Sequence, residues 1–370
     1  MDAGERDAMG DIGEIDSRKS ERQSLRSRKS DGNRCTMNGM KSGSAKPMNK
    51  LRTIARLIGP FAGLIFVFMI FRIIAPSAFY STYNLKTIVT QSVITGVGAM
   101  GMTLVIIAGG IDLSVGSVIA LCTVIVARLL ASWGDASGAL LPLCAATIAV
   151  GCGALCGFVN GYLSAGMRIV PFIVTLGTMQ IVRGAAKWLG REQTVLAPST
   201  WLNSCMDVDP APAWLFVAPG VWMLIALAAA TALVLRRTVF GRHVFALGSN
   251  EAAARLCGID VVKTRVLIYA LCGACTGLAG IMQFANLTVG DPTAAGGMEL
   301  DIIAAVVIGG GSLAGGEGSA LGSLLGAVLM AMLRNGCNLV GIPNYVQNIL
   351  IGAIIIAAVA LDRYKQRAQV

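Results

Sequence analysis

The amino-acid sequence predicts an all-α polytopic membrane protein with about ten transmembrane helices, some broken or re-entrant at glycine-rich segments. Of its 370 residues, 55% are hydrophobic and 14% charged, and the mean hydropathy is +0.70. Several apolar stretches reach about 20 residues, enough to cross a hydrocarbon core roughly 30 Å thick. The 45 glycines suit closely packed membrane helices, because small residues let two backbones approach.

The elements follow in order from the distribution of apolar residues. Residues 1–50 are polar and without apolar periodicity, so we expect a disordered, basic cytoplasmic tail. Residues 51–365 form the predicted transmembrane domain. Its ten expected helices cover approximately residues 57–74, 85–108, 115–131, 139–163, 170–189, 214–235, 266–285, 300–311, 320–333 and 346–361. The eighth is short, which indicates a broken or tilted segment.

The basic residues predict the orientation of these helices. With the tail inside, 23 of the 30 lysines and arginines lie on the inner face. The positive-inside rule then places both termini in the cytoplasm, in a bacterial inner (plasma) membrane. Seven basic residues remain on the outer face: Arg72, Lys86, Arg128, Arg183, Lys187, Arg191 and Arg334. We expect Arg183 and Lys187 to snorkel outward, or else to contact an acidic partner or a substrate path.

Composition also excludes some functions. The net charge of +10 lies in the tail and at helix ends, a pattern typical of contact with anionic lipid head groups. Aromatic residues do not alternate with the basic ones, so we expect no nucleic-acid partner. The cysteines lie mostly in apolar stretches, and His243 is the single histidine. We therefore expect no metal site and no cofactor.

The segment from Gly109 to Ser117 interrupts the apolar region with an acid, two hydroxyls and several glycines. Asp112 is well placed to cap the helix that follows, its carboxylate accepting from free N–H groups. Direct contact with a substrate is compatible with that structural role. The run 105–110 (VIIAGG) also resembles 306–311 (VVIGGG), 201 residues later. This is either a duplicated half with an interrupted helix, as in transporters, or a chance likeness of apolar glycine runs.

A polar stretch, residues 236–265, predicts a cytoplasmic loop with a short helix. Ser249 or Asn250 can cap the start of this helix, Glu251 suits its positive first turn, and Gly258 suits its end. By themselves these features predict only a well-capped helix on the inner face.

Two further segments follow. Glu299 and Asp301 stand two apart where the eighth helix begins. They either cap that helix and face water, or face a partner protein or the entrance for a substrate. Residues 309–319 are rich in glycine, but no lysine follows as a phosphate-binding loop requires. We therefore expect this chain not to bind or hydrolyse ATP.

Four motifs, in order and in spacing, resemble the ribose-type ABC sugar permeases, over roughly residues 55–365. They are 110–117 (GIDLSVGS), 170–184 (VPFIVTLGTMQIVRG), 240–259 (FGRHVFALGSNEAAARLCGI) and 299–318 (ELDIIAAVVIGGGSLAGGEG). The resemblance implies transport of a ribose-like monosaccharide by two permease chains. It also implies ATPase subunits on the cytoplasmic face, which bind the ATP, and a periplasmic sugar-binding protein.

The resemblance also assigns roles to residues. The loop helix is similar to the coupling helix that rests in a groove of the ATPase, with candidate residues Gly241, Asn250, Glu251, Ala252, Ala253 and Gly258. The other motif residues are candidates for the translocation path or its structural breaks: Gly110, Asp112, Ser114, Gly116, Ser117, Glu299, Asp301, Gly310 and Gly311.

Three alternatives remain at this point. A branched-chain amino-acid permease is related, but it must receive a zwitterion, and the GIDLSVGS signature favours a sugar. An ion-coupled secondary transporter needs ionisable groups deep in the membrane, whereas the acids here cluster near helix ends. For a membrane enzyme, the sequence contains neither the H-E-x-x-H nor the G-x-S-x-G motif that would supply catalytic residues.

Overall fold

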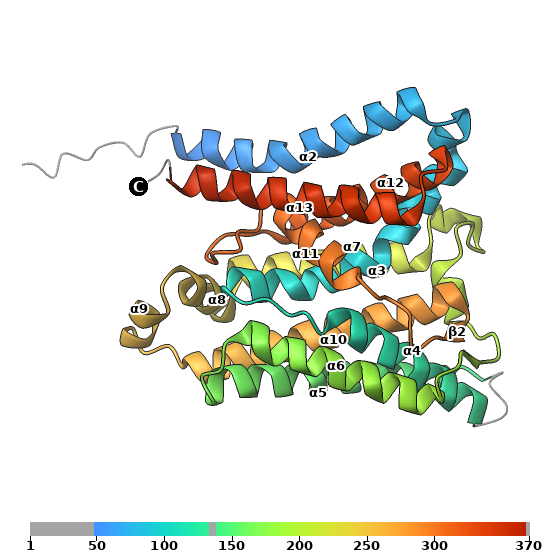
Figure 1. The fold of residues 1–370 in the computed structure, drawn as a ribbon, viewed down its shortest axis with the longest axis horizontal. Helices are drawn as coiled ribbons and strands as arrows, with labels where there is room; N and C mark the ends of the chain where they lie inside the picture. Colours follow the sequence, from blue (N-terminus) through green and yellow to red (C-terminus); the bar gives the residue numbers. More distant parts are fainter. Residues whose placement is uncertain (1–47, 133–137, 368–370) are drawn as a thin grey trace, which may run out of the picture. The chain divides into compact units, whose positions relative to one another are not determined.

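The computed structural model describes residues 48–132 and 138–367. The chain divides into two units between Thr53 and Ile54, and the fold below is that of the second. The predicted tail therefore lies outside the described residues, apart from its last three. The described α-helices are α2 (Met48–Ile74), α3 (Thr82–Ile107), α4 (Val115–Ser132), α5 (Leu140–Gly166), α6 (Pro171–Gly190), α7 (Pro219–Arg237), α8 (Val239–Ser249), α9 (Glu251–Leu256), α10 (Val261–Leu287), α11 (Met298–Ile308), α12 (Ala320–Val340) and α13 (Asn344–Arg367) (Figure 1).

Short elements join these helices. Strands β1 (Val195–Leu196) and β2 (Val289–Gly290) form one antiparallel pair. Three 3-10 helices cover Ser77–Tyr80, Asn203–Met206 and Ala213–Leu215. Within the second unit, β2 lies at one end of the helices, whereas α8 and α9 lie at the other, where α13 also ends (Figure 1).

The sequence explains where several helices begin. The side chain of Ser81 accepts from the Asn84 amide at the start of α3, and that of Ser319 accepts from the Gly322 amide at the start of α12. These bonds satisfy amides that have no partner inside the helix. Pro171 and Pro219 occupy the first turns of α6 and α7, where a missing N–H costs nothing.

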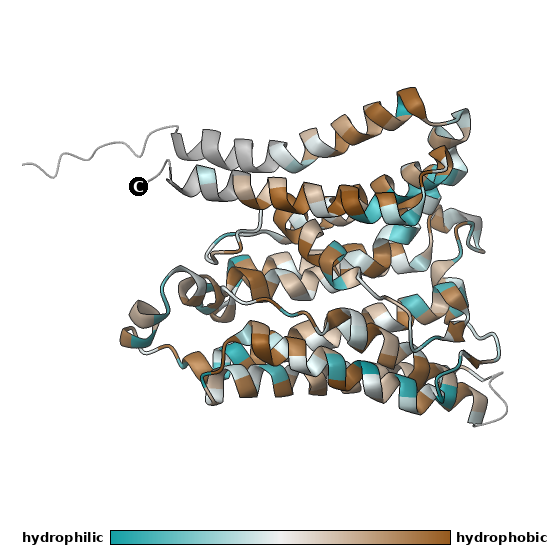
Figure 2. Ribbon diagram, in the orientation of Figure 1, coloured by the Kyte–Doolittle hydropathy of each residue, from teal (hydrophilic) through white to brown (hydrophobic). Residues whose placement is uncertain are grey.

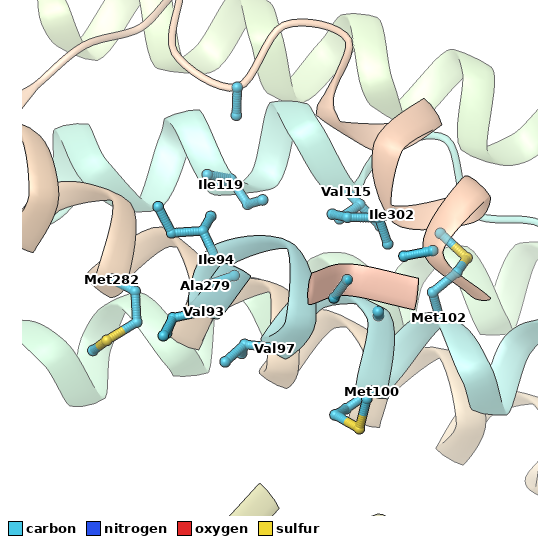
Figure 3. Close-up of a cluster of buried hydrophobic side chains, with 14 of the residues drawn as sticks. Val93, Ile94, Val97, Met100, Met102, Val115, Ile119, Ala279, Met282 and Ile302 are labelled. Carbon is cyan, nitrogen blue, oxygen red and sulfur yellow. The ribbon is translucent and has the colours of Figure 1, made fainter. Parts of the chain in front are cut away.

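Helix α10 packs against α3, α4 and α5 and lies in the middle of the core. Its contact with α5 depends on glycine. A Cβ added to Gly153 or Gly157 of α5 would overlap the backbone of α10, at Gly273 and Tyr269 respectively, and one on Gly277 would overlap α5. Small residues repeating every four positions thus let the two backbones touch. Beside this seam, side chains of α3, α4, α10 and α11 form a buried apolar cluster, which includes Val97, Ile119 and Ile302 (Figure 3).

Each of the ten predicted membrane segments is helical. By length and hydropathy, six of the described helices can cross a membrane: α3, α4, α5, α7, α10 and α12. Helix α11 has 11 residues and spans only about 16 Å, so it is a short segment, as the sequence indicated. The total of about ten membrane spans stays a prediction.

Many large apolar side chains are exposed on the outside of the helices, and hydrophobic residues recur along most of the described helices (Figure 2). Leu155 of α5 and Ile181 of α6 are 61% and 73% exposed. A soluble protein rarely leaves broad apolar faces open to water. With six spans of sufficient length, these faces identify a multi-pass membrane protein whose surface contacts lipid.

Candidate functional site

The two glycine runs 201 residues apart end their helices in the same way. After α3, the Gly109 amide donates to Ile106 O at 2.9 Å and the Gly110 amide to Val105 O at 2.9 Å. After α11, the Gly310 amide donates to Val307 O at 2.9 Å and the Gly311 amide to Val306 O at 2.8 Å.

Gly109 and Gly310 both have positive φ, +78° and +92°, which suits glycine at a helix end. The likeness between the two runs is therefore structural, and the first of the two interpretations of this repeat gains support. We call residues 108–114 the first break and residues 309–319 the second break.

The two breaks contact each other. The Gly316 amide of the second break donates to the carbonyl of Ile107, the last residue of α3, at 2.8 Å. A Cβ on Gly315 would lie 3.0 Å from the Cα of Gly109. The backbones therefore meet with no side chain between them.

Asp112 is buried inside the first break and has a structural role. Its Oδ1 accepts from the Ser114 amide at 2.9 Å and from the Ser114 hydroxyl at 2.6 Å. Asn160 of α5, which is fully buried, donates to Ser114 Oγ at 2.9 Å and more weakly to Asp112 Oδ1 at 3.5 Å. The predicted cap on the free amides of α4 differs from this arrangement, because the amide that Asp112 binds belongs to Ser114, directly before α4 begins at Val115. The bonds of Ser114 Oγ and Asn160 Nδ2 join the first break to α5.

Two more helices hold the same break. The carbonyl of Ile111 accepts from Thr175 of α6 and from the Tyr269 hydroxyl of α10, both at 3.4 Å. Gly110 leaves room for that hydroxyl, since a Cβ there would lie 2.5 Å from it. Sequence reasoning missed Asn160 and Tyr269. The sequence gives little indication of their contacts with the first break, because one polar residue in an apolar helix has many structural uses.

Gly116 of α4 lies next to Glu299 of α11. A Cβ on Gly116 would overlap the Glu299 carboxylate and lie 2.6 Å from the carbonyl of Ala295. The Ser117 hydroxyl and Glu299 Oε2 are buried, and neither has a hydrogen-bond partner among the described residues. Such groups are costly in an apolar interior.

Asp301 is buried, so the expectation that it faces water is wrong. Its Oδ2 lies 2.6 Å from Arg334 Nη2 and 2.8 Å from Arg334 Nε, in α12. Side chains at i and i+2 of a helix point in different directions, so Glu299 and Asp301 do not act as a pair. Arg334 neutralises Asp301 and joins α11 to α12.

Arg183 differs from its predicted outward orientation as well. It is half-buried, and its guanidinium donates to the carbonyls of Pro292 and Ala294 at 3.1 and 2.8 Å. These bonds hold the segment that leads into α11. Among the described residues, no group of three His, Cys, Asp or Glu side chains could hold a metal ion.

At the opposite end, the loop 236–265 contains two short helices, α8 and α9, where one was expected. Asn250 caps α9, since its side chain accepts from the Ala253 amide at 3.0 Å. Gly258 follows the helix with φ +83°. Both positions were predicted from sequence, whereas α8 was not, because its apolar residues Val244 and Leu247 pack into the core instead of marking a membrane span.

Glu251 fastens α9 to α10. Its Oε2 lies 2.7 Å from Arg265 Nη2, and its Oε1 lies 3.2 Å from Arg255 Nη2. The hydrogen bond from Arg265 is the main reason that the pKa of Glu251 lies below its usual value. Glu251 therefore forms two ion pairs in addition to the favourable interaction with the helix dipole that the sequence predicts. Ala252 and Ala253, in contrast, expose their side chains.

Helix α8 connects this loop to both breaks. Gly241 lets α8 pack on α7, since a Cβ there would overlap the carbonyls of Val234 and Leu235. At the other end of α8, a Cβ on Gly248 would overlap Ile107 O and lie 2.6 Å from the Gly316 amide nitrogen. We call the meeting point of Gly109, Gly248 and Gly315 the glycine junction. Three backbones from distant parts of the sequence touch there.

Comparison with known proteins agrees with this architecture. Residues 84–359 match the family model described as "Branched-chain amino acid transport system / permease component". The ribose import permease of Escherichia coli is 39% identical over 288 residues, which are 78% of this chain and 88% of the relative. That of Bacillus subtilis is 38% identical over 315 residues, 84% of this chain and 94% of the relative. The fructose import permease of Rhizobium meliloti is 34% identical over 313 residues, 82% of this chain and 84% of the relative. No solved structure matches.

Proposed function

The chain belongs to the family of ABC-importer permeases that includes the ribose and fructose import permeases, and we propose how it carries a monosaccharide across the bacterial inner membrane. A separate ATPase subunit on the cytoplasmic face drives the movement, and a periplasmic binding protein delivers the sugar. The chain acts as a homodimer with both termini in the cytoplasm. It supplies no ATPase motif or cofactor of its own.

A sugar suits the polar groups of the site better than a branched-chain amino acid does. The Ser117 hydroxyl and Glu299 Oε2 are buried without partners among the described residues, and sugar hydroxyls can both donate to and accept from such groups. A zwitterion needs a free charge of each sign. Asp301 and Arg334 already neutralise each other, and the Arg183 guanidinium, which attracts the Glu299 carboxylate, donates to two backbone carbonyls. The family description names an amino-acid system, but the relatives above that cover most of this chain import sugars.

The path we propose passes the first break and the start of α11. Ser117 and Glu299 contact the sugar, whereas Asp112 and Ser114 keep α4 in position. Gly110 and Gly116 leave room for Tyr269 and Glu299. Gly310 and Gly311 end α11 and form the second break. Asp301 has a structural role through Arg334.

The loop 236–265 is the coupling element in this proposal. Helix α9 exposes Ala252 and Ala253, and Leu256 beside them is 90% exposed. An apolar face at the end of the protein away from β2 suits a groove of the ATPase. When the ATPase closes, it moves α9, and the ion pair of Glu251 with Arg265 passes the force to α10.

The proposed mechanism rests on one observation, the contact of Gly248 with Ile107 and Gly316. It joins α8 to both breaks through backbone atoms, which cannot rotate out of the way as side chains do. A displacement of α8 therefore reaches α3, α4 and α11 at once. The two breaks can then change the width of the path together.

Substrate class is tested with cells that express the chain together with its ATPase and binding protein. Accumulation of labelled ribose, fructose or arabinose is measured with excess unlabelled sugar or leucine as competitor. We expect one of the sugars to be taken up and leucine to have no effect. Uptake of labelled leucine, with no sugar transported, would favour the amino-acid permease.

A further inference from the structure

Seven basic residues lie at the end of the protein where the positive-inside rule expects few. Four of them are engaged by an aromatic ring, an acidic side chain or two backbone carbonyls. Arg72 lies over the ring of Tyr80, Lys86 pairs with Asp209, Arg183 donates to two carbonyls, and Arg334 pairs with Asp301. The other three are Arg128, Lys187 and Arg191.

These three residues line one cavity at the end of α6. The cavity has a volume of about 760 Å³, and its lining also includes Trp188 and Glu192. Arg128 comes from α4, and its Nε donates to the carbonyl of Leu189 at 2.9 Å, so its remaining N–H groups are free to bind a ligand. Within the described ranges, the side chains of Lys187 and Arg191 have neither an ion pair nor a hydrogen bond. We call this feature the basic cavity.

The charge of the basic cavity selects an anion. Three cations face one carboxylate, that of Glu192, so the lining keeps an excess of two positive charges. Such a volume lies in the range of small-molecule sites. Arginine and lysine together are the usual partners of phosphate, since guanidinium groups bind its oxygens in pairs.

The surface beside the cavity indicates where this anion comes from. Trp188 and Ile181 lie seven residues apart on one face of α6, and they are 80% and 73% exposed. This face is apolar and ends at the basic cavity. Tryptophan is typical of the membrane–water interface. A phospholipid could therefore place its acyl chains on the face of α6 and its head group among the cations.

We propose that the basic cavity binds the phosphate group of an anionic phospholipid from the outer leaflet. The lipid stabilises the positions of α4 and α6 relative to each other, because Arg128 belongs to one helix and Lys187 to the other. A bound lipid phosphate also explains why three cations lie on the outer face, where the positive-inside rule expects few. Nothing in this proposal depends on which substrate the permease carries.

The test is native mass spectrometry of the purified full chain, titrated with phosphatidylglycerol or phosphatidylcholine. We expect tight retention of one phosphatidylglycerol. Lys187→Gln and Arg191→Gln should each weaken that retention about fivefold, since each removes one cation near the lipid phosphate. Arg72→Gln removes the same charge at the same end of the protein, away from the basic cavity, and should leave retention unchanged.

Three results would overturn the proposal. The first is equal retention of phosphatidylglycerol by all four proteins. The second is stabilisation by inorganic phosphate equal to that by phosphatidylglycerol, which would identify a site for a soluble anion. The third is unchanged lipid retention with a loss of ATPase stimulation by the binding protein in the Lys187 and Arg191 variants alone. That result would make the cavity a docking site for an acidic protein.

Discussion

The substitution Gly248→Ala tests the glycine junction. The new Cβ would overlap Ile107 O and lie 2.6 Å from the Gly316 nitrogen. Both are main-chain atoms, so α8 must retreat by roughly 1.5–2 Å to restore an ordinary contact. Overpacking of this kind costs about 1–3 kcal/mol. The population with α8 seated on both breaks should then fall roughly 5- to 140-fold relative to the displaced form.

The assay is the number of sugar molecules transported per ATP hydrolysed, in proteoliposomes that contain the ATPase and the binding protein. We expect Gly248→Ala to insert normally and to lose transport more than hydrolysis. Gly177→Ala is the matched control, because this helical glycine of α6 has no atom within 4 Å of an added Cβ. It should gain up to about 1 kcal/mol in stability and transport normally.

The reasoning would be refuted if Gly248→Ala transported as many sugar molecules per ATP hydrolysed as the wild type, with unchanged thermal stability. It would mean that the three backbones separate freely and that force from the ATPase reaches the path by another route. A variant that fails to insert is replaced by Gly315→Ala, which tests the same junction from the second break.

Four other predictions concern the loop 236–265. Glu251→Lys should lower uptake and ATPase stimulation together, because it places a cation beside Arg265; Arg265→Glu in the same chain should restore part of both. The pKa of Glu251 is lowered in the folded loop, so its ion pairs are formed above the ordinary value of 4.5 and are lost only as pH falls below it. Transport and ATPase stimulation should therefore stay coupled and unchanged between about pH 6 and 8. A loss of coupling in that range would implicate another group. Gly258→Val should strain the φ of +83° by about 1–2 kcal/mol and reduce transport, whereas Gly258→Asn, which tolerates that conformation, should retain it; equal activity of both variants would make the end of α9 unimportant. Cys257 is exposed, so a maleimide that cannot cross the membrane should modify it in inverted vesicles and not in intact cells, as read by peptide mass spectrometry; labelling from outside would reverse the predicted topology.

Local signals allowed much of the fold to be predicted from the sequence. Apolar length located the ten helices, and the caps at Asn250 and Gly258 follow from residue type alone. Asp112 was expected to cap the helix that follows, but it accepts from Ser114, before α4 begins. These features depend on neighbours within a few residues.

The parts that were missed depend on contacts between distant residues. Nothing near Asp301 in the sequence indicates Arg334, 33 residues later, so the acid was expected either in water or facing a partner protein or the substrate entrance, and not in an ion pair with α12. Helix α8 was not separated from α9, since its apolar side chains number too few to form a membrane span. The contact of Gly248 with Ile107 and Gly316 could not be predicted at all, because a glycine needed for close packing looks the same as one in a loose turn.

The central claim is that ATP hydrolysis by a separate subunit moves a monosaccharide through this chain. Its most direct test is sugar uptake into proteoliposomes that contain the chain and the binding protein, with and without the ATPase. We predict no hydrolysis by the chain alone, and uptake only with the ATPase and ATP, unaffected by ionophores. Uptake without the ATPase that stops when ionophores collapse the ion gradients would contradict the account and identify an ion-coupled transporter.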